Sequence, residues 1–156
     1  MAEFTAISLH QPYASLLVTT RHGRVKVHET RGRPAPPKHL GKRIAIHAAQ
    51  RRVVPYELTP AVFELCVMHF GDDFADTLPY GAYVGTVILA TSLRIPYGDR
   101  PVEGMSAGPV DEDDFECGDW APGRWAWRAD EPYPITPPFP DRGRQGWWTA
   151  HIEPAP

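Results

Sequence analysis

A lysine, a glutamate and an arginine lie close together in the first part of the chain, as Lys26, Glu29 and Arg31. On a regular strand Glu29 and Arg31 share a face, with Cα atoms roughly 7 Å apart. Lys26 has the opposite parity, so it can join them only from the turn before the strand or from a bulge. Together they could bind phosphate or carbonyl oxygens through Lys26 and Arg31, while Glu29 accepts hydrogen bonds from a base amino group. An internal ion pair that closes one end of the fold is the alternative.

The same residues could also carry out hydrolysis. Lys26 would accept a proton and Glu29 would handle the proton on a water, which would cleave an amide or a phosphodiester of a nucleoside or an RNA. The glycine patterns of nucleotide-triphosphate and dinucleotide sites are absent, as is a Gly-x-Ser-x-Gly elbow. We therefore expect no cofactor and no metal, and an enzyme with this site would be a metal-independent hydrolase.

A second group of candidates follows the first expected strand. Gln11, Pro12 and Tyr13 stand at the start of an expected helix, which would aim backbone N–H groups and the Tyr13 ring at the mouth of the fold. Tyr13 could instead be a core residue. His47, on the third expected strand, completes the expected ligand-binding set.

The histidines and tryptophans could bind a metal or a ligand, or they could be structural residues. His10, His28 and His47 lie on or beside different expected strands, but they lack the short spacings of a metal site. We expect no metal there, with His28 at the surface. The five tryptophans are expected to be mainly core residues, with at most one in contact with a ligand.

Charge is distributed unevenly along the chain. Residues 21–52 hold ten of the sixteen lysines and arginines and one acid, Glu29, whereas the rest of the chain is acidic. A basic segment of this kind is typical of proteins that bind a phosphate-bearing partner, because its field attracts anions and phosphate neutralisation releases counterions. A solvated basic face paired with the acidic part of the same fold is the alternative.

Hydrophobic periodicity predicts short strands and helices in one domain over residues 1–156. Strands are expected at 4–9, 24–31, 43–48, 81–95, 124–128 and 145–152, helices at 12–20 and 59–71, and an extended proline-rich stretch at 132–140. Gly85 interrupts the long strand as a bulge or a point of close approach. Residues 97–120 are rich in acids and glycines and are expected to be a flexible insertion without a calcium-loop pattern.

The order of several short motifs resembles an ASCH domain, over nearly the whole chain. The blocks are residues 7–16, 26–31, 44–49, 81–87, 123–127 and 145–148. ASCH domains are similar to PUA-type RNA-binding domains and carry a cleft motif Gly-x-Lys-x-x-Glu-x-Arg. Lys26, Glu29 and Arg31 fit this motif, whereas Gly23 stands one position early.

The resemblance implies a function in RNA or nucleotide recognition. Some similar small bacterial proteins are amidohydrolases that act on N4-acetylcytidine through a Lys and a Thr three residues later, and others have been proposed as ribonucleases. Here the position three after Lys26 is Glu29, and Thr30 is one residue late. We therefore do not expect the Thr-nucleophile mechanism.

These observations predict the α+β class, as a small PUA-like β-barrel of five or six strands flanked by two or three helices. The expected function is an RNA- or modified-nucleotide-binding module with a basic cleft, and a nucleoside or RNA hydrolase is the alternative. Two cysteines, no basic stretch before an apolar run at the start and no long apolar stretch indicate a cytoplasmic protein that does not enter a membrane.

Overall fold

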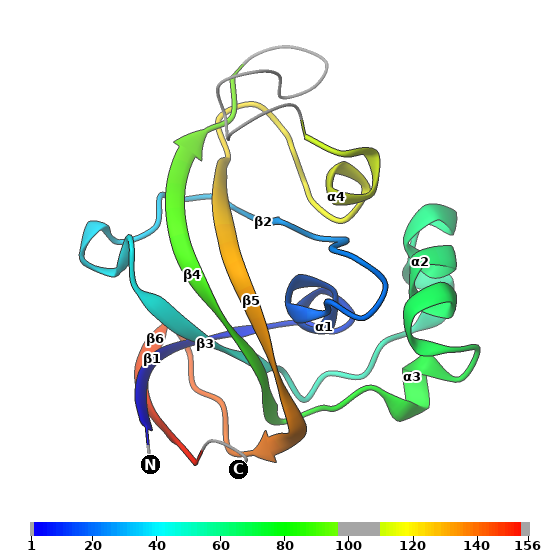
Figure 1. The fold of residues 1–156 in the computed structure, drawn as a ribbon. Helices are drawn as coiled ribbons and strands as arrows, with labels where there is room; N and C mark the ends of the chain where they lie inside the picture. Colours follow the sequence, from blue (N-terminus) through cyan, green and yellow to red (C-terminus); the bar gives the residue numbers. More distant parts are fainter. Residues whose placement is uncertain (1, 97–109, 154–156) are drawn as a thin grey trace.

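The computed structural model describes residues 2–96 and 110–153, and in this part of the chain one mixed sheet has the strand order β2-β5-β4-β3-β1-β6 (Figure 1). The strands are β1 (Ala2–Leu9), β2 (His28–Arg31), β3 (Arg43–Ala48), β4 (Ala82–Arg94), β5 (Trp125–Pro140) and β6 (Trp147–Ile152). β1 and β3 are parallel, and the other neighbours are antiparallel. The predicted α+β class with five or six strands is confirmed.

The sheet curves strongly but is not closed into a barrel by hydrogen bonds between its described strands (Figure 1). Its edge strands are β2 and β6, at opposite ends of the strand order. Arg31 on β2 spans part of the opening, because its Nη2 lies 3.4 Å from the carbonyl oxygen of Ser8 on β1. A side chain therefore links the edge strand β2 to β1, the strand next to the other edge, without a backbone ladder between them.

Helix α1 lies in the hollow of the curved sheet, and α2 and α3 lie beyond it (Figure 1). The helical elements are α1 (Tyr13–Val18), η1 (Pro37–His39), η2 (Pro55–Glu57), α2 (Pro60–Phe70), α3 (Phe74–Thr77) and α4 (Glu112–Glu116). As the sequence predicts, Thr59 caps α2 by accepting a hydrogen bond from the Val62 N–H, and α2 ends at Gly71 with a φ of 96°.

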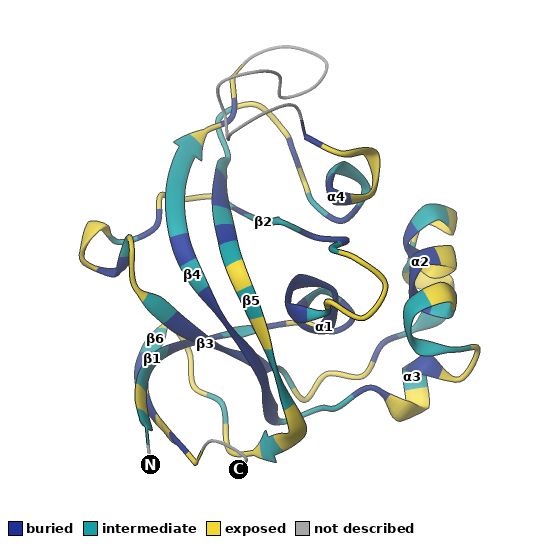
Figure 2. Cartoon of the chain, in the orientation of Figure 1, coloured by how far each residue is buried: buried dark blue, intermediate teal, exposed yellow. Residues whose placement is uncertain are grey.

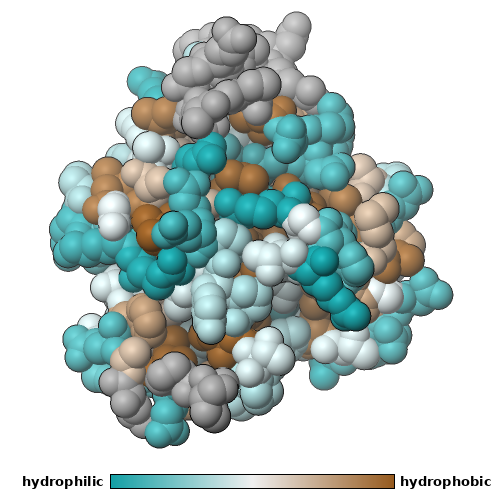
Figure 3. Space-filling view, in the orientation of Figure 1, coloured by the Kyte–Doolittle hydropathy of each residue, from teal (hydrophilic) through white to brown (hydrophobic). Residues whose placement is uncertain are grey.

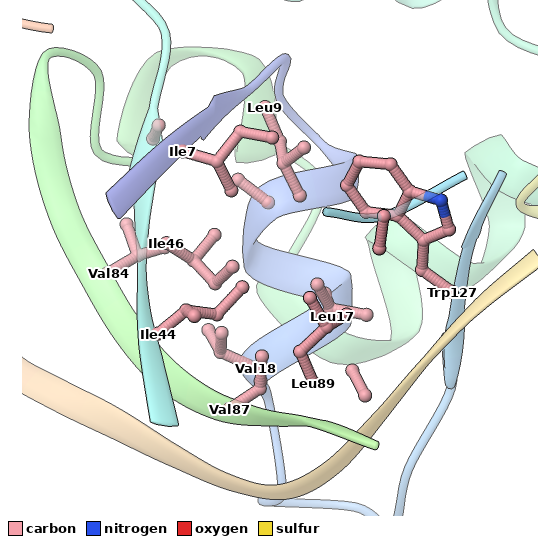
Figure 4. Close-up of a cluster of buried hydrophobic side chains, with 14 residues drawn as sticks. Ile7, Leu9, Leu17, Val18, Ile44, Ile46, Val84, Val87, Leu89 and Trp127 are labelled. Atoms are coloured by element: carbon pink, nitrogen blue, oxygen red, sulfur yellow. The ribbon is translucent and has the colours of Figure 1, made fainter. Parts of the chain in front are cut away.

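The largest group of buried side chains fills the space between α1 and the concave face of the sheet (Figure 4). Leu17 and Val18 of α1 meet aliphatic side chains from β1, β3 and β4 and the ring of Trp127. A second buried group joins Leu16, on the other side of α1, to α2 and α3. Because α1 is buried between these two groups, the segment that precedes it has a fixed position relative to the sheet.

Gly85 is the point of closest approach between α1 and the sheet. A Cβ at Gly85 would lie 2.7 Å from Cβ of Val18 and 2.9 Å from the carbonyl oxygen of Tyr133, so no larger residue fits without movement. The registers of β4 with β3 and with β5 shift beside this residue. The sequence-based prediction of a bulge or close approach at Gly85 is therefore confirmed.

Burial is deepest in the middle of the sheet, where β3 and the first half of β4 are dark blue in Figure 2. On the face drawn in Figure 3, hydrophobic side chains form small separate areas between hydrophilic ones. A surface of that kind is typical of a protein without a broad apolar docking face on that side.

Several elements differ from the sequence-based expectations. β2 begins at His28 instead of at residue 24, and residues 132–140 belong to β5 because they pair with β4. The helix expected over 12–20 is shortened to α1. Of the expected insertion, residues 97–109 lie outside the described residues, whereas residues 110–120 contain α4 and bury Asp114 and Trp120 against the body.

Candidate functional site

A cavity of about 590 Å³ opens between the end of β1, the start of α1, β2, the start of α2 and the segment after α4. We name it the Glu29 cavity. The polar side chains in its lining include His10, Tyr13, Glu29, Arg31, Asp119 and Arg124. Its size is in the range of pockets that bind small organic ligands.

The carboxylate of Glu29 is held between two cations at this cavity. Its Oε1 lies 3.3 Å from Nζ of Lys26, and its Oε2 lies 3.1 Å from Nε of Arg31. Lys26 stands before the first residue of β2, which is one of the two arrangements that the parity of the three residues allowed. The structure therefore brings the three residues together, with the Glu29 side chain 18 % exposed.

Lys26 lies behind Glu29, away from solvent. Its side chain is 1 % exposed, and Nζ donates a hydrogen bond to the carbonyl oxygen of Cys117 at 3.2 Å. Nζ also lies 5.8 Å from the centre of the Tyr13 ring. A buried ammonium group needs such partners, and these contacts leave Lys26 to position Glu29 and not to face the cavity.

Arg31 presents part of its guanidinium group to the cavity. The side chain is 35 % exposed, and its Cζ lies 5.5 Å from the centre of the Trp127 ring. The contact with the ring and the bond to Glu29 fix the orientation of the fork, which suits Arg31 to bind an oxygen ligand in the cavity.

Arg124 and Asp119 also line the cavity, beside β2. The Nε group of Arg124 donates to the carbonyl oxygen of Asp119 at 3.1 Å, and Nη2 donates to the carbonyl oxygen of Thr30 at 3.2 Å. Neither residue was among the sequence-predicted candidates. The motif block 123–127 contains Arg124, but its position near Arg31 depends on the pairing of β2 with β5.

A buried contact between Asp114 and His28 holds α4 against β2. His28 Nδ1 lies 2.7 Å from Oδ2 of Asp114, and both side chains are 2 % exposed. The Oδ1 atom accepts hydrogen bonds from the backbone N–H groups of Val27 and His28. His28 is thus not at the surface as expected, because Asp114 pairs with it across 86 residues.

The pKa of Asp114 reflects two opposing effects. Burial favours the neutral acid, but the hydrogen bond and the charge of His28 and the two backbone N–H groups outweigh it, so the pKa lies below its usual value. The carboxylate is therefore ionised at neutral pH and able to hold this wall of the cavity.

Other expected ligand-binding residues have structural partners instead. Gln11 is buried, accepts from the Ser15 N–H and donates to the Pro79 carbonyl oxygen, so it satisfies the start of α1 itself. Pro12 is also buried. His47 is 1 % exposed and does not line the cavity; it contacts the Ser8 hydroxyl and the Asp141 carbonyl oxygen. Of the group around the first helix, only Tyr13 reaches the cavity.

Burial keeps both cysteine thiols and the Tyr13 hydroxyl in their neutral forms at neutral pH. It raises the pKa of the Cys117 thiol to about 11 and that of the Cys66 thiol to about 12. Burial also raises the pKa of the Tyr13 hydroxyl. Cys117 lines the cavity, but a thiol with this pKa is a poor nucleophile at neutral pH.

The cations of residues 21–52 do not all line one cavity. Only Arg31 among them lines the Glu29 cavity, with Lys26 behind it. Lys38 and Lys42 line a different cavity, and Arg43 pairs with a carboxylate on β5. The cavity carries acids as well as cations, so the expected basic cleft is a site of mixed charge.

Within residues 2–96 and 110–153, no group of three or more histidines, cysteines, aspartates and glutamates is arranged to hold a metal ion. In the same ranges, no helix has the length and apolar character needed to span a membrane.

Comparison with known proteins finds no family model and no curated protein that matches this chain. Among solved structures, a mutant of the ZmASCH protein from Zymomonas mobilis is similar, with 19 % sequence identity and a TM-score of 0.45. The match covers 87 % of this chain and 74 % of the other.

We expect Asp114→Ala to lower the free energy of unfolding by roughly 3–5 kcal/mol, because it leaves His28 and two backbone N–H groups without their acceptor. Urea unfolding measures the change, and Asp113→Ala on the exposed side of α4 is the control.

The ionised Asp114 stabilises the fold above the usual Asp pKa of about 3.9, and this contribution is lost as the pH falls through the lower folded pKa. Between about pH 5 and pH 2, the wild type should therefore lose more stability than Asp114→Asn. An equal loss would contradict the assignment.

Proposed function

We propose that the chain is an ASCH-like module whose Glu29 cavity binds a base of RNA or a modified nucleotide. The observation that carries this proposal is the Glu29 carboxylate, fixed at the wall of a cavity of about 590 Å³ by Lys26 on one oxygen and Arg31 on the other. The order of the sequence motifs that contain these residues supports it.

A carboxylate held in this way is suited to read the edge of a base. It is an acceptor only, and amino groups of cytosine, adenine and guanine are donors that it can recognise. Because Lys26 and Arg31 fix both oxygens of Glu29, little side-chain entropy remains to be lost on binding. Lys26 acts as a positioning residue, since it contacts one oxygen of the carboxylate without lining the cavity.

Phosphate or carbonyl oxygens of the ligand would be bound by the arginines. Arg31 and Arg124 line the cavity and each retains exposed surface, with side chains 35 % and 32 % exposed. The planar fork of arginine can donate two hydrogen bonds to one phosphate, which a lysine cannot match. The Tyr13 ring offers a face for stacking at the same cavity.

We expect Glu29→Gln alone to lower the free energy of unfolding by roughly 3–5 kcal/mol, because the buried Lys26 loses its carboxylate. The double variant Lys26→Met/Glu29→Gln should regain most of that stability. It should still lose the preference for cytidine and adenosine monophosphates over uridine monophosphate, measured by calorimetric titration. A double variant that keeps the wild-type preference would contradict base reading by Glu29.

Arg31→Ala should weaken the binding of a short single-stranded RNA by about tenfold and change the free energy of unfolding by no more than about 1 kcal/mol. Arg31→Lys should restore only part of the affinity, because the fork is lost. Fluorescence anisotropy at about 50 and about 200 mM salt measures the affinity. Arg21→Ala, on an exposed arginine that does not line the cavity, is the control. Large destabilisation with unchanged affinity would instead assign Arg31 to a structural ion pair.

Hydrolysis of an amide or phosphodiester is the second candidate, and the contact of 3.3 Å between Lys26 Nζ and Glu29 Oε1 favours it because that pair could move a proton. Thr30 does not supply a free nucleophile, since its hydroxyl oxygen accepts a hydrogen bond from the Asp119 N–H.

We therefore expect turnover of N4-acetylcytidine to be weak or absent, and any RNA cleavage to be unaffected by EDTA. Incubation of the purified protein with N4-acetylcytidine and with labelled RNA, each with and without EDTA, measures both. Rapid deacetylation that Lys26→Ala abolishes would overturn the binding-only function, provided that the variant remains folded by circular dichroism. Cleavage that EDTA abolishes would show that a metal takes part.

A further inference from the structure

We propose that a second cavity, lined by Lys38, His39, Lys42 and Trp147, binds a neighbouring nucleotide of the same single-stranded RNA. This inference rests on the proposed function, because the first base of that strand occupies the Glu29 cavity. We name the second site the Trp147 cavity; it has a volume of about 300 Å³ and lies between η1 and the strands β1 and β6.

The charges of the Trp147 cavity suit a phosphate group. Lys38 and Lys42 line it, both are exposed, and neither forms an ion pair within the described part of the chain. No carboxylate lines this cavity, whereas Glu29 and Asp119 line the first one. The hydroxyl groups of Thr5 and Thr149 complete its polar lining.

His39 provides a polar atom without a partner. The residue is 8 % exposed, and its Nε2 is buried without a hydrogen bond. Such an atom loses its water on folding and gains no hydrogen bond in return, so this wall of the cavity carries an unsatisfied polar atom. Burial and the nearby charges of Lys38 and Lys42 lower the pKa of His39.

Aromatic surface beside the lysines favours a nucleotide over a simple anion. The His39 and Trp147 rings have centroids 4.5 Å apart, and Trp147 is only partly buried. Single-stranded RNA is bound by such combinations, because cations contact the backbone while bases stack on aromatic rings. An acidic peptide would use the lysines but would have no reason to contact the indole.

A continuous series of contacts connects the two cavities. The Arg31 guanidinium lies 5.5 Å from the Trp127 ring centre, and the Trp127 and Trp147 rings stack with centroids 5.9 Å apart. Arg31 lines the first cavity and Trp147 lines the second. The two sites are thus linked by two stacked indoles, of which Trp127 is buried in the core.

The test measures how RNA affinity depends on the length of the strand and on Lys38 and Lys42. We expect a labelled strand of about six nucleotides to bind at least about tenfold more tightly than a mononucleotide. Lys38→Ala/Lys42→Ala should lose this gain while its mononucleotide affinity stays at the wild-type value. The slope of log affinity against log salt should fall by about 0.7 for each lysine. Arg21→Ala/Arg51→Ala removes the same charge from exposed positions outside both cavities and should change neither quantity by as much.

A ¹⁵N-labelled protein locates the strand directly. The indole N–H resonance of Trp147, assigned with Trp147→Phe, should shift with the six-nucleotide strand and not with the mononucleotide. An unchanged resonance, or a lysine variant that binds the strand as tightly as the wild type, would overturn the second site. A shift with an aspartate-rich peptide in place of RNA would also overturn it. If only the proposed function of the Glu29 cavity is wrong, Arg31→Ala should leave mononucleotide binding unchanged. The Trp147 resonance should then still shift with the six-nucleotide strand.

Discussion

The burial of Lys26 constrains the whole candidate site. An ammonium group that is 1 % exposed is stable only with acceptors close by, and the fold supplies the Glu29 carboxylate and the Cys117 carbonyl oxygen. The first acceptor belongs to β2 and the second to the segment after α4, so one side chain fixes the distance between two walls of the cavity. The same contact orients Glu29, whose second oxygen then holds Arg31. The polar geometry of the cavity therefore follows from the need to satisfy one buried charge.

A second buried carboxylate explains why β2 is short and why the acidic stretch folds. Asp114 takes the Val27 and His28 N–H groups, which a longer strand would have donated to a neighbouring strand or to solvent. This contact lets the chain before β2 turn inward, and Lys26 follows that turn into the interior. The acids beside Asp114 on α4 remain exposed, so one residue in an acidic run determines the position of the run.

Local patterns in the sequence were sufficient for most elements and for part of the site. The expected strand ranges overlap all six strands, Thr59 and Gly71 mark the ends of α2 as expected, and the parity of Lys26 against Glu29 allowed a position before the strand or at a bulge. His47 was expected in the site from its place on a strand and Gln11 from its place at a helix start, but neither position shows whether a side chain faces a cavity, and both residues are buried with structural partners. Arg124 and the pair of His28 with Asp114 depend on contacts across about ninety residues, which no local pattern contains.

Cations that lie close together in the sequence line different cavities in the folded chain. Residues 21–52 contain most of the cations, but only Arg31 among them lines the mixed-charge Glu29 cavity, and Lys38 and Lys42 line the Trp147 cavity, which has no carboxylate. Where cations and acids alternate, their fields largely cancel at a distance, and affinity depends on hydrogen bonds of defined direction. Where lysines stand alone, attraction reaches farther and is screened by salt. A ligand that contacts both sites would be selected by the first and attracted by the second, so specificity and salt dependence would arise from different residues.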